Sequence, residues 1–411
     1  MTDYRNNHYV PVWFQERFFD AAQREKKYYY LDLSPERVTS EGHSFTRNEI
    51  RRLGAKSCFF QRDLYTTSLS GLISTEIEKK FFGQIDSESI SSVDYFANFS
   101  HPSADGNLYQ RFLLYLSLQK LRTPKGLKYL SSVTRIRTSN GLLYAIQELQ
   151  MLFCAIWTES VWSILDGGDS GIGFLLSDHP VTVYNQGAFP ASSWCKNGLD
   201  PHIWLNGTHT LFPLSPSKLL VLTNLSWVRH PYGNPLKNRP NPNPLRPAIF
   251  NFTQIQTGRR LSPEEMLSIN YIIKNRAFRY VAASNRDWLF PEQQMVKPQW
   301  NALGEKHLLM PDPRSVSFST EILMGFNDGT SDAFDEYGRK PWEPNYQDKE
   351  RKERDWETFQ AFRGEYARLF GPVRRGCSYD YGKEDNGTDS DDFHRYHLSL
   401  EQRHKKHRYN R

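Results

Sequence analysis

Two stretches near the middle of the chain decide the fold: Phe-Leu-Leu-Ser-Asp-His-Pro-Val-Thr-Val-Tyr at 174–184 and Gly-Thr-His-Thr-Leu-Phe-Pro-Leu-Ser-Pro-Ser-Lys-Leu-Leu-Val-Leu at 207–222. Short apolar runs bounded by turn formers are typical of buried β-strands. The strands break at the polar residues 177–180 and again at 213–216. Reactive groups are commonly carried where such strands end, so this region is where a functional site is expected.

Segments with helical periodicity lie on either side of these strands. Apolar residues recur at threes and fours over 105–122, 142–165 and 262–277, which predicts three long helices. Ser262, Pro263 and Glu265 form a helix-start signature. The predicted fold class is therefore α+β, with one mixed or antiparallel central sheet covered by long helices.

The predicted domain organisation has three parts. Residues 1–345 form a single α+β domain and residues 346–374 a C-terminal helix. Residues 375–411 are rich in Gly, Asp, Ser, Arg and His and lack apolar periodicity, so we predict a disordered tail there.

Composition restricts the classes of protein to consider. The chain has 411 residues, a net charge of +6 and four widely spaced cysteines without a C-x-x-C motif, which argues against a zinc ribbon. It has no apolar segment at the N-terminus and no run of eighteen apolar residues, which predicts a soluble, cytoplasmic protein that does not enter a membrane. Nucleic acid is a possible partner through the basic tail residues, which are Arg403, Lys405, Lys406, Arg408 and Arg411.

Five polar residues are candidates for catalysis: His8, Arg122, Asp178, His179 and Glu159. A neutral imidazole suits a general base or a metal ligand, and an arginine at a helix end suits a carboxylate or phosphate. Each also has a structural alternative. The histidine at position 8 would pin the N-terminal arm through backbone, Arg122 would satisfy helix carbonyls, and Asp178 would cap a turn before proline.

Cofactor use is left open. Glu76, Asp86, Asp178 and Glu159 supply carboxylates that would suit a divalent metal, whereas scattered acids are more often solvated surface. The chain contains no G-x-S-x-G, Walker A, G-x-G-x-x-G or H-E-x-x-H motif, which argues against common nucleotide-binding, hydrolase and zinc-peptidase folds.

Several motifs together resemble those of a known family. They are His-Tyr-Val-Pro at 8–11, Arg-Thr-Pro at 122–124, Ser-Asp-His-Pro-Val at 177–181 and Phe-Pro-Leu at 212–214. In these motifs the chain resembles an uncharacterised, mainly bacterial domain-of-unknown-function family. The resemblance spans most of residues 7–335 and implies no settled activity.

Two functional hypotheses remain from the sequence. The first is a hydrolytic enzyme, with phosphodiesters as candidate substrates, in which His8, Arg122 and Asp178 converge in one cleft. The second is a non-enzymatic binding or sensor protein in which the same residues are structural. The enzyme hypothesis requires polar residues from distant segments to share a concave site. Under the binding hypothesis, each of these side chains would form separate hydrogen bonds with backbone groups.

Overall fold

The alternation of side chains along one buried strand explains how the core is built. In a computed structural model of the chain, strand β13 (Lys218–Asn224) sends Leu220 and Leu222 into one apolar cluster and Leu219 and Val221 into another. Successive side chains of a strand point to opposite faces. A sheet covered on both faces therefore needs the continuous apolar run that the sequence shows.

The structure describes residues 6–40, 43–69, 72–100, 104–239, 255–316, 321–325, 328–335, 339–373, 375–376 and 391–408. The strands besides β13 are β1 (Asn6–His8), β2 (Tyr28–Asp32), β3 (Arg37–Ser40), β4 (His43–Thr46), β5 (Ile50–Leu53), β6 (Phe60–Arg62), β7 (Thr67–Leu69), β8 (Leu72–Ser74), β9 (Ser160–Asp166), β10 (Leu176–Ser177), β11 (Thr182–Asn185), β12 (Thr208–Pro213), β14 (Gln256–Arg260), β15 (Tyr280–Ala283), β16 (Glu321–Gly325) and β17 (Ser331–Asp335).

The α-helices are α1 (Val12–Glu16), α2 (Gly83–Ala97), α3 (Gly106–Leu121), α4 (Pro124–Thr134), α5 (Ser139–Glu148), α6 (Cys154–Thr158), α7 (Leu225–Arg229), α8 (Pro263–Arg276), α9 (Pro291–Gln294), α10 (Lys349–Phe370) and α11 (Asp391–Arg408). Shorter helical turns are η1 (Ala55–Ser57), η2 (Ile77–Phe82), η3 (Gly168–Ser170), η4 (Ser193–Gly198), η5 (Asp287–Leu289), η6 (Trp300–His307) and η7 (Pro313–Ser315). None of these described helices has the length and apolarity needed to cross a bilayer.

Two sheets organise the described part of the chain. The larger has the strand order β11-β12-β13-β9-β14 and is antiparallel except for the parallel pair β14 and β9. The smaller has the antiparallel order β10-β15-β2-β5. Helices and mixed sheets together confirm the α+β fold class. The single predicted sheet is divided because the turn at Asp178–Pro180 leads the chain from β10 in the smaller sheet to β11 in the larger.

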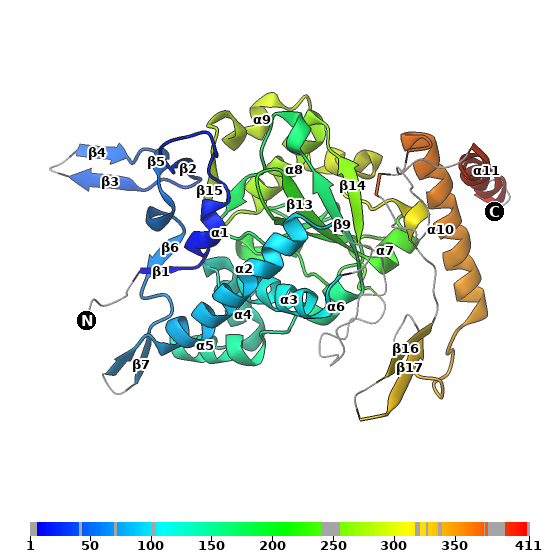
Figure 1. Cartoon of the computed structure of the whole chain (residues 1–411), viewed down its shortest axis with the longest axis horizontal. Helices are drawn as coiled ribbons and strands as arrows, with labels where there is room; N and C mark the ends of the chain where they lie inside the picture. The colour runs from blue at the N-terminus through cyan, green and yellow to red at the C-terminus, as the bar shows by residue number, and fades with distance from the viewer. Residues whose placement is uncertain are drawn as a thin grey trace.

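Helices cover both faces of the larger sheet (Figure 1). The cluster on the face of Leu220 contains Phe96 of α2, Phe112 of α3 and Trp162 of β9. The cluster on the opposite face contains Met266 and Ile269 of α8. The predicted helices at 105–122 and 262–277 are confirmed, and Ser262 and Glu265 form the expected capping box.

The predicted helix over 142–165 is wrong. The chain instead forms α5, a turn, the short helix α6 and then β9. Residues 160–165 are buried on both sides, so they show no alternation that would distinguish a strand from a buried helix. Pairing with β13 along seven residues decides the conformation in favour of a strand.

The C-terminal part packs at the side of the molecule opposite the β3–β4 hairpin (Figure 1). The predicted helix in 346–374 is confirmed as α10, which buries Phe359, Phe362 and Tyr366 against Trp227 and Val161. Within the segment predicted to be a disordered tail, the structure describes α11, which packs on α10. Residues 377–390 and 409–411 lie outside the described residues, and so do the side chains of Arg403, Lys405, Lys406, Arg408 and Arg411.

Candidate functional site

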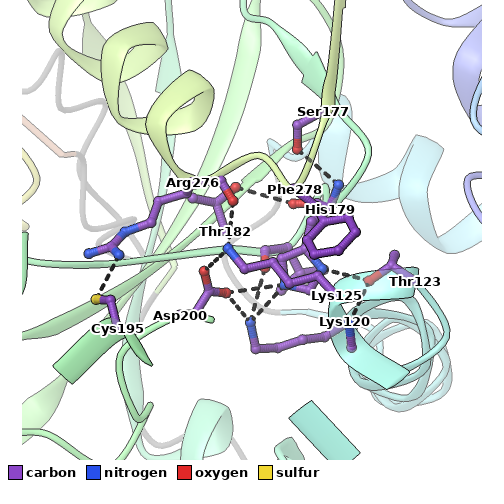
Figure 2. Close-up of polar contacts among 12 residues, drawn as sticks. Lys120, Thr123, Lys125, Ser177, His179, Thr182, Cys195, Asp200, Arg276 and Phe278 are labelled. Carbon is purple, nitrogen blue, oxygen red and sulfur yellow. Dashed lines mark hydrogen bonds and ion pairs between the residues drawn. The ribbon is translucent and has the colours of Figure 1, made fainter. Parts of the chain in front are cut away.

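A buried cluster of four ionisable side chains lies where two helix ends and two loops meet. Lys120 comes from the end of α3 and Lys125 from the first turn of α4, while His179 follows β10 and Asp200 follows η4 (Figure 2). The two lysine residues are 7% and 2% exposed. Ionised groups are rarely this buried unless they are paired, so the contacts within the cluster decide its chemistry.

The junction between α3 and α4 brings both lysines to one side. Thr123 is the N-cap of α4, and its side-chain oxygen accepts a hydrogen bond from the Gly126 backbone N–H at 3.1 Å. Proline at the first helical position favours this start because its φ suits the helix. A Cβ on Gly126 would lie 2.1 Å from the Lys120 carbonyl oxygen, so only glycine allows the two helices to approach this closely.

Asp200 is the centre of the cluster. Its Oδ2 accepts from Lys120 Nζ at 2.7 Å, and its Oδ1 accepts from Lys125 Nζ at 2.5 Å. Burial disfavours the ionised carboxylate, but Lys120 and Lys125 outweigh this effect and hold the pKa of Asp200 well below its ordinary value. The carboxylate is therefore ionised at neutral pH.

The two lysines share one counter-ion. Lys125 also donates to the Arg276 backbone carbonyl at 2.6 Å, and Lys120 donates to the Val181 carbonyl at 3.2 Å. Burial, and then the positive charge of Lys125, lower the pKa of Lys120, although Asp200 opposes the shift. A buried lysine with a lowered pKa is the usual form of a lysine that acts as a general base or nucleophile.

The ring of His179 is held at both nitrogens. Nδ1 lies 2.7 Å from Thr123 Oγ1, and Nε2 lies 3.1 Å from Asp200 Oδ2. Because the ionised Asp200 carboxylate can only accept, we place the ring proton on Nε2, which donates to Asp200, and Nδ1 then accepts from the Thr123 O–H. Lys120 Nζ lies 3.3 Å from the same Nε2. Burial, and then the charge of Lys120, lower the pKa of His179 to about 3. The neutral ring therefore orients Asp200 and is a weak base.

A small cavity opens beside this cluster. Its lining residues are Lys120, Lys125, Gly126, Tyr129, Phe153, His179, Leu199, Asp200, Pro201, His202 and Ile203. About 20 Å³ is accessible to the centre of a water molecule, which is enough for about one or two waters. The charged lining groups are two lysines and one aspartate, so a small anion is the ligand that this cavity suits.

Of the five predicted site residues, His179 alone lines this cavity. Asp178, the preceding residue, faces a different group. Its carboxylate accepts from the backbone N–H groups of Phe278 at 2.8 Å, Arg279 at 2.6 Å and Tyr280 at 2.9 Å. Burial raises the pKa of Asp178 to about 6 in spite of these three donors. The two adjacent side chains thus contact different parts of the protein.

Arg122 and His8 lie in separate contacts. Arg122 is 1% exposed and forms a bidentate pair with Asp86, with Nη1–Oδ2 at 3.0 Å and Nη2–Oδ1 at 2.8 Å. The ring of His8 lies 3.2 Å through Nε2 from the Lys56 carbonyl oxygen, which is the backbone contact of the structural alternative. Among the described residues, no hydrogen bond joins His8, Arg122 and Asp178, and each has partners of its own. Their convergence in one cleft stays a prediction.

The carboxylates considered for a metal also occupy different places. Glu159 pairs with Arg239, and Glu76 pairs with Lys80. In the part of the chain that the structure describes, no group of three or more His, Cys, Asp or Glu side chains gathers in a way that would hold a metal ion.

Lys120, Lys125 and Asp200 were not among the site residues predicted from the sequence. The two lysines lie on either side of Arg122-Thr123-Pro124, of which Arg122 alone was a candidate site residue. A helix that ends and restarts within three residues turns the chain sharply, and this was the one signal that both amines lie together. Asp200 carried no signal because it lies in an irregular loop.

These features define an α+β protein with a buried Lys–His–Asp cluster beside a small cavity. The chain belongs to the family described as protein of unknown function (DUF4238), whose model matches residues 6–287. All residues of the cluster lie within this match, whereas α10 and α11 lie outside it. No curated protein and no solved structure matches the chain.

Proposed function

We propose that the phosphate group of a small molecule binds at this cavity, with the rest of the molecule outside it, and that the protein hydrolyses a phosphoester there. The observation that carries this proposal is that two buried ammonium groups, Lys120 and Lys125, converge on the single carboxylate of Asp200 at the cavity wall. Two cations with one anion leave a positive charge in a site of low dielectric, where an anionic ligand is favoured.

The proposed roles follow from the contacts. Lys125 binds the phosphate as a point charge. Lys120 stabilises the negative charge on the phosphoryl oxygens while the water oxygen bonds to phosphorus and the ester P–O bond breaks. The proton that the water loses goes to the departing oxygen, which leaves as the alcohol. His179 is a positioning residue, since both ring nitrogens are engaged and its pKa is too low for a base at neutral pH.

Non-enzymatic binding is the second candidate. The observation that favours it is that Thr123, the hydroxyl group in contact with His179, is fully buried and does not line the cavity. A Thr123–His179–Asp200 relay therefore lacks a nucleophile that faces a substrate. In this alternative the same lysines bind an anion and no bond is cleaved.

The test measures binding of inorganic phosphate by calorimetry and hydrolysis of bis-p-nitrophenyl phosphate and p-nitrophenyl phosphate. Lys125→Met should weaken phosphate binding about tenfold or more, because a charge-assisted hydrogen bond is lost. Lys120→Met should abolish hydrolysis. Lys196→Met is the matched control, since Lys196 is exposed and lies only four residues from Asp200.

The outcomes separate the candidates. Phosphate binding that depends on Lys125, with neither ester hydrolysed, would favour the binding protein over the hydrolase. Absence of phosphate binding, or equal affinity in Lys125→Met and the control, would refute both. Thermal melting of each variant shows whether a loss of binding reflects unfolding.

A further inference from the structure

A second cavity lies at the end of the smaller sheet. It has a volume of about 570 Å³, which is in the range of small-molecule sites. Its lining residues are Phe19, Asp20, Ala21, Gln23, Tyr29, Pro216, Ser284, Asn285 and Trp288. They come from the turn after α1, from β2, from the turn between β12 and β13, and from the segment after β15. The first cavity shares none of these residues.

The composition of this lining restricts the ligand. Three aromatic rings are present, from Phe19, Tyr29 and Trp288, and four polar side chains, from Asp20, Gln23, Ser284 and Asn285. The aliphatic side chains are limited to Ala21 and Pro216, and these lining residues include no Lys, Arg or His. A phosphorylated ligand would find no cation among the lining residues and would lie beside the carboxylate of Asp20. An alkyl ligand would bury the polar groups without partners.

We propose that this second cavity binds a neutral sugar in its pyranose form. The C–H groups on one face of such a ring pack against aromatic rings. Each sugar hydroxyl both donates and accepts a hydrogen bond. A carboxylate accepts from two hydroxyl groups, and an amide donates to one and accepts from another, so Asp20, Gln23 and Asn285 match the hydroxyl groups of one ring.

Local contacts hold the polar groups in place before a ligand arrives. Asp20 Oδ1 accepts from the Ala22 N–H at 2.9 Å, and Asn285 Oδ1 accepts from the Asp287 N–H at 2.9 Å. In the described part of the chain, no hydrogen bond engages the side-chain nitrogen of Gln23 or Asn285, so both can donate to a ligand. Groups fixed in advance lose less entropy on binding.

The position of Trp288 depends on a glycine. A Cβ added to Gly173 would lie 2.3 Å from the Trp288 ring, at Cζ3. The indole of Trp288 therefore packs directly against the backbone of Gly173. This contact prevents the segment after β15 from moving closer to Gly173. This contact provides a fixed aromatic surface at the cavity.

A neighbouring charge argues against a cationic ligand. The Arg52 guanidinium lies 5.7 Å from the centre of the Tyr29 ring and donates to Gln23 Oε1 at 3.3 Å. Aromatic cages bind quaternary ammonium groups through the same ring faces. Here Arg52 already occupies a face of Tyr29 and would repel a second cation, whereas it has no such effect on a neutral sugar.

The experiment is saturation-transfer NMR with glucose, galactose, N-acetylglucosamine, cellobiose and lactose at millimolar concentration, followed by titration of any sugar that gives a signal. Trp288→Ala should remove the signal, and Trp288→Tyr should retain part of it. Asp20→Ala should raise the dissociation constant about tenfold, because a charged acceptor is lost. Asp20 is exposed, so this variant keeps the fold.

Two controls make the assignment specific. Trp342→Ala and Asp169→Ala remove the same side chains at exposed positions elsewhere and should leave sugar binding unchanged. Lys125→Met should also leave it unchanged, which separates this proposal from the phosphate site. The proposal is overturned if none of the five sugars gives a signal, if the signal survives both Trp288→Ala and Asp20→Ala, or if tetramethylammonium competes for the cavity.

Discussion

Asp178 shows how a buried charge can be structural. Its carboxylate lies between the turn after β10 and the start of β15, and it accepts three backbone hydrogen bonds from residues 278–280. Phe278 and Arg279 directly precede β15 and Tyr280 begins it, so the carboxylate satisfies the backbone N–H groups at the start of this strand. The side chain therefore fixes where β15 starts.

We expect Asp178→Ala to lower the free energy of unfolding by about 3 kcal/mol, because each buried donor left without a partner costs about 1–3 kcal/mol and water can satisfy some of them. Urea denaturation followed by circular dichroism measures this change. Asp169→Ala is the control, since that exposed carboxylate should change stability by less than about 0.5 kcal/mol. A loss of stability equal to that of the control would show that the carboxylate is not needed for the fold.

The sequence located Asp178 and His179 but not their roles. A functional site was expected where this strand ends before Pro180, and both residues are buried. Asp178 binds a segment about 100 residues further along the chain, and His179 contacts Asp200, about 20 residues further along. No local pattern encodes such distances.

At the scale of elements, α10 and α11 form a pair of helices at one side of the core. Gly364 of α10 faces α11, where an added Cβ would lie 2.5 Å from the Glu401 backbone nitrogen. Arg368 Nε also donates to the Glu401 carboxylate at 3.0 Å. The close approach of the two helices thus depends on the absence of a side chain at position 364.

Gly364→Leu should release α11 from α10 without unfolding the core, since the added side chain cannot fit between the helices. Hydrogen exchange of residues 391–401 should become markedly faster, while the amides of β9 and β13 keep their protection. Glu357→Leu adds the same side chain at an exposed position of α10 and should leave α11 protected. Unchanged exchange in Gly364→Leu would mean that the helices can separate slightly and still pack.

At the scale of the whole molecule, buried histidines link stability to pH. Burial lowers the pKa of His179 and of His209 to about 3, against about 6.5 in an unfolded chain. The unfolded chain therefore binds more protons between these values. The stability that comes from each neutral ring is present above pH 6.5 and is lost as the pH falls toward 3.

From pH 7 to pH 5 each of these two histidines should lower the free energy of unfolding by about 2 kcal/mol. Asp178 acts in the opposite direction, because its pKa of about 6 lets the folded state take up a proton in the same range. Urea denaturation at both pH values measures the net change, and His179→Gln should reduce the loss by about 2 kcal/mol. An equal loss in the wild-type protein and His179→Gln would show that the ring is protonated in the fold.

The sequence by itself determined the fold class, the helices at 105–122 and 262–277, the helix within 346–374, and the family. These features follow from periodicity, caps and motifs that are local in the chain. Only the tertiary structure decided that residues 160–166 form a strand, that the central strands belong to two sheets, and that Lys120, Lys125, His179 and Asp200 meet. A strand that is buried on both faces has no alternation of apolar and polar residues by which the sequence could reveal it. The pairing of charged groups depends on which distant loops the packed core brings together.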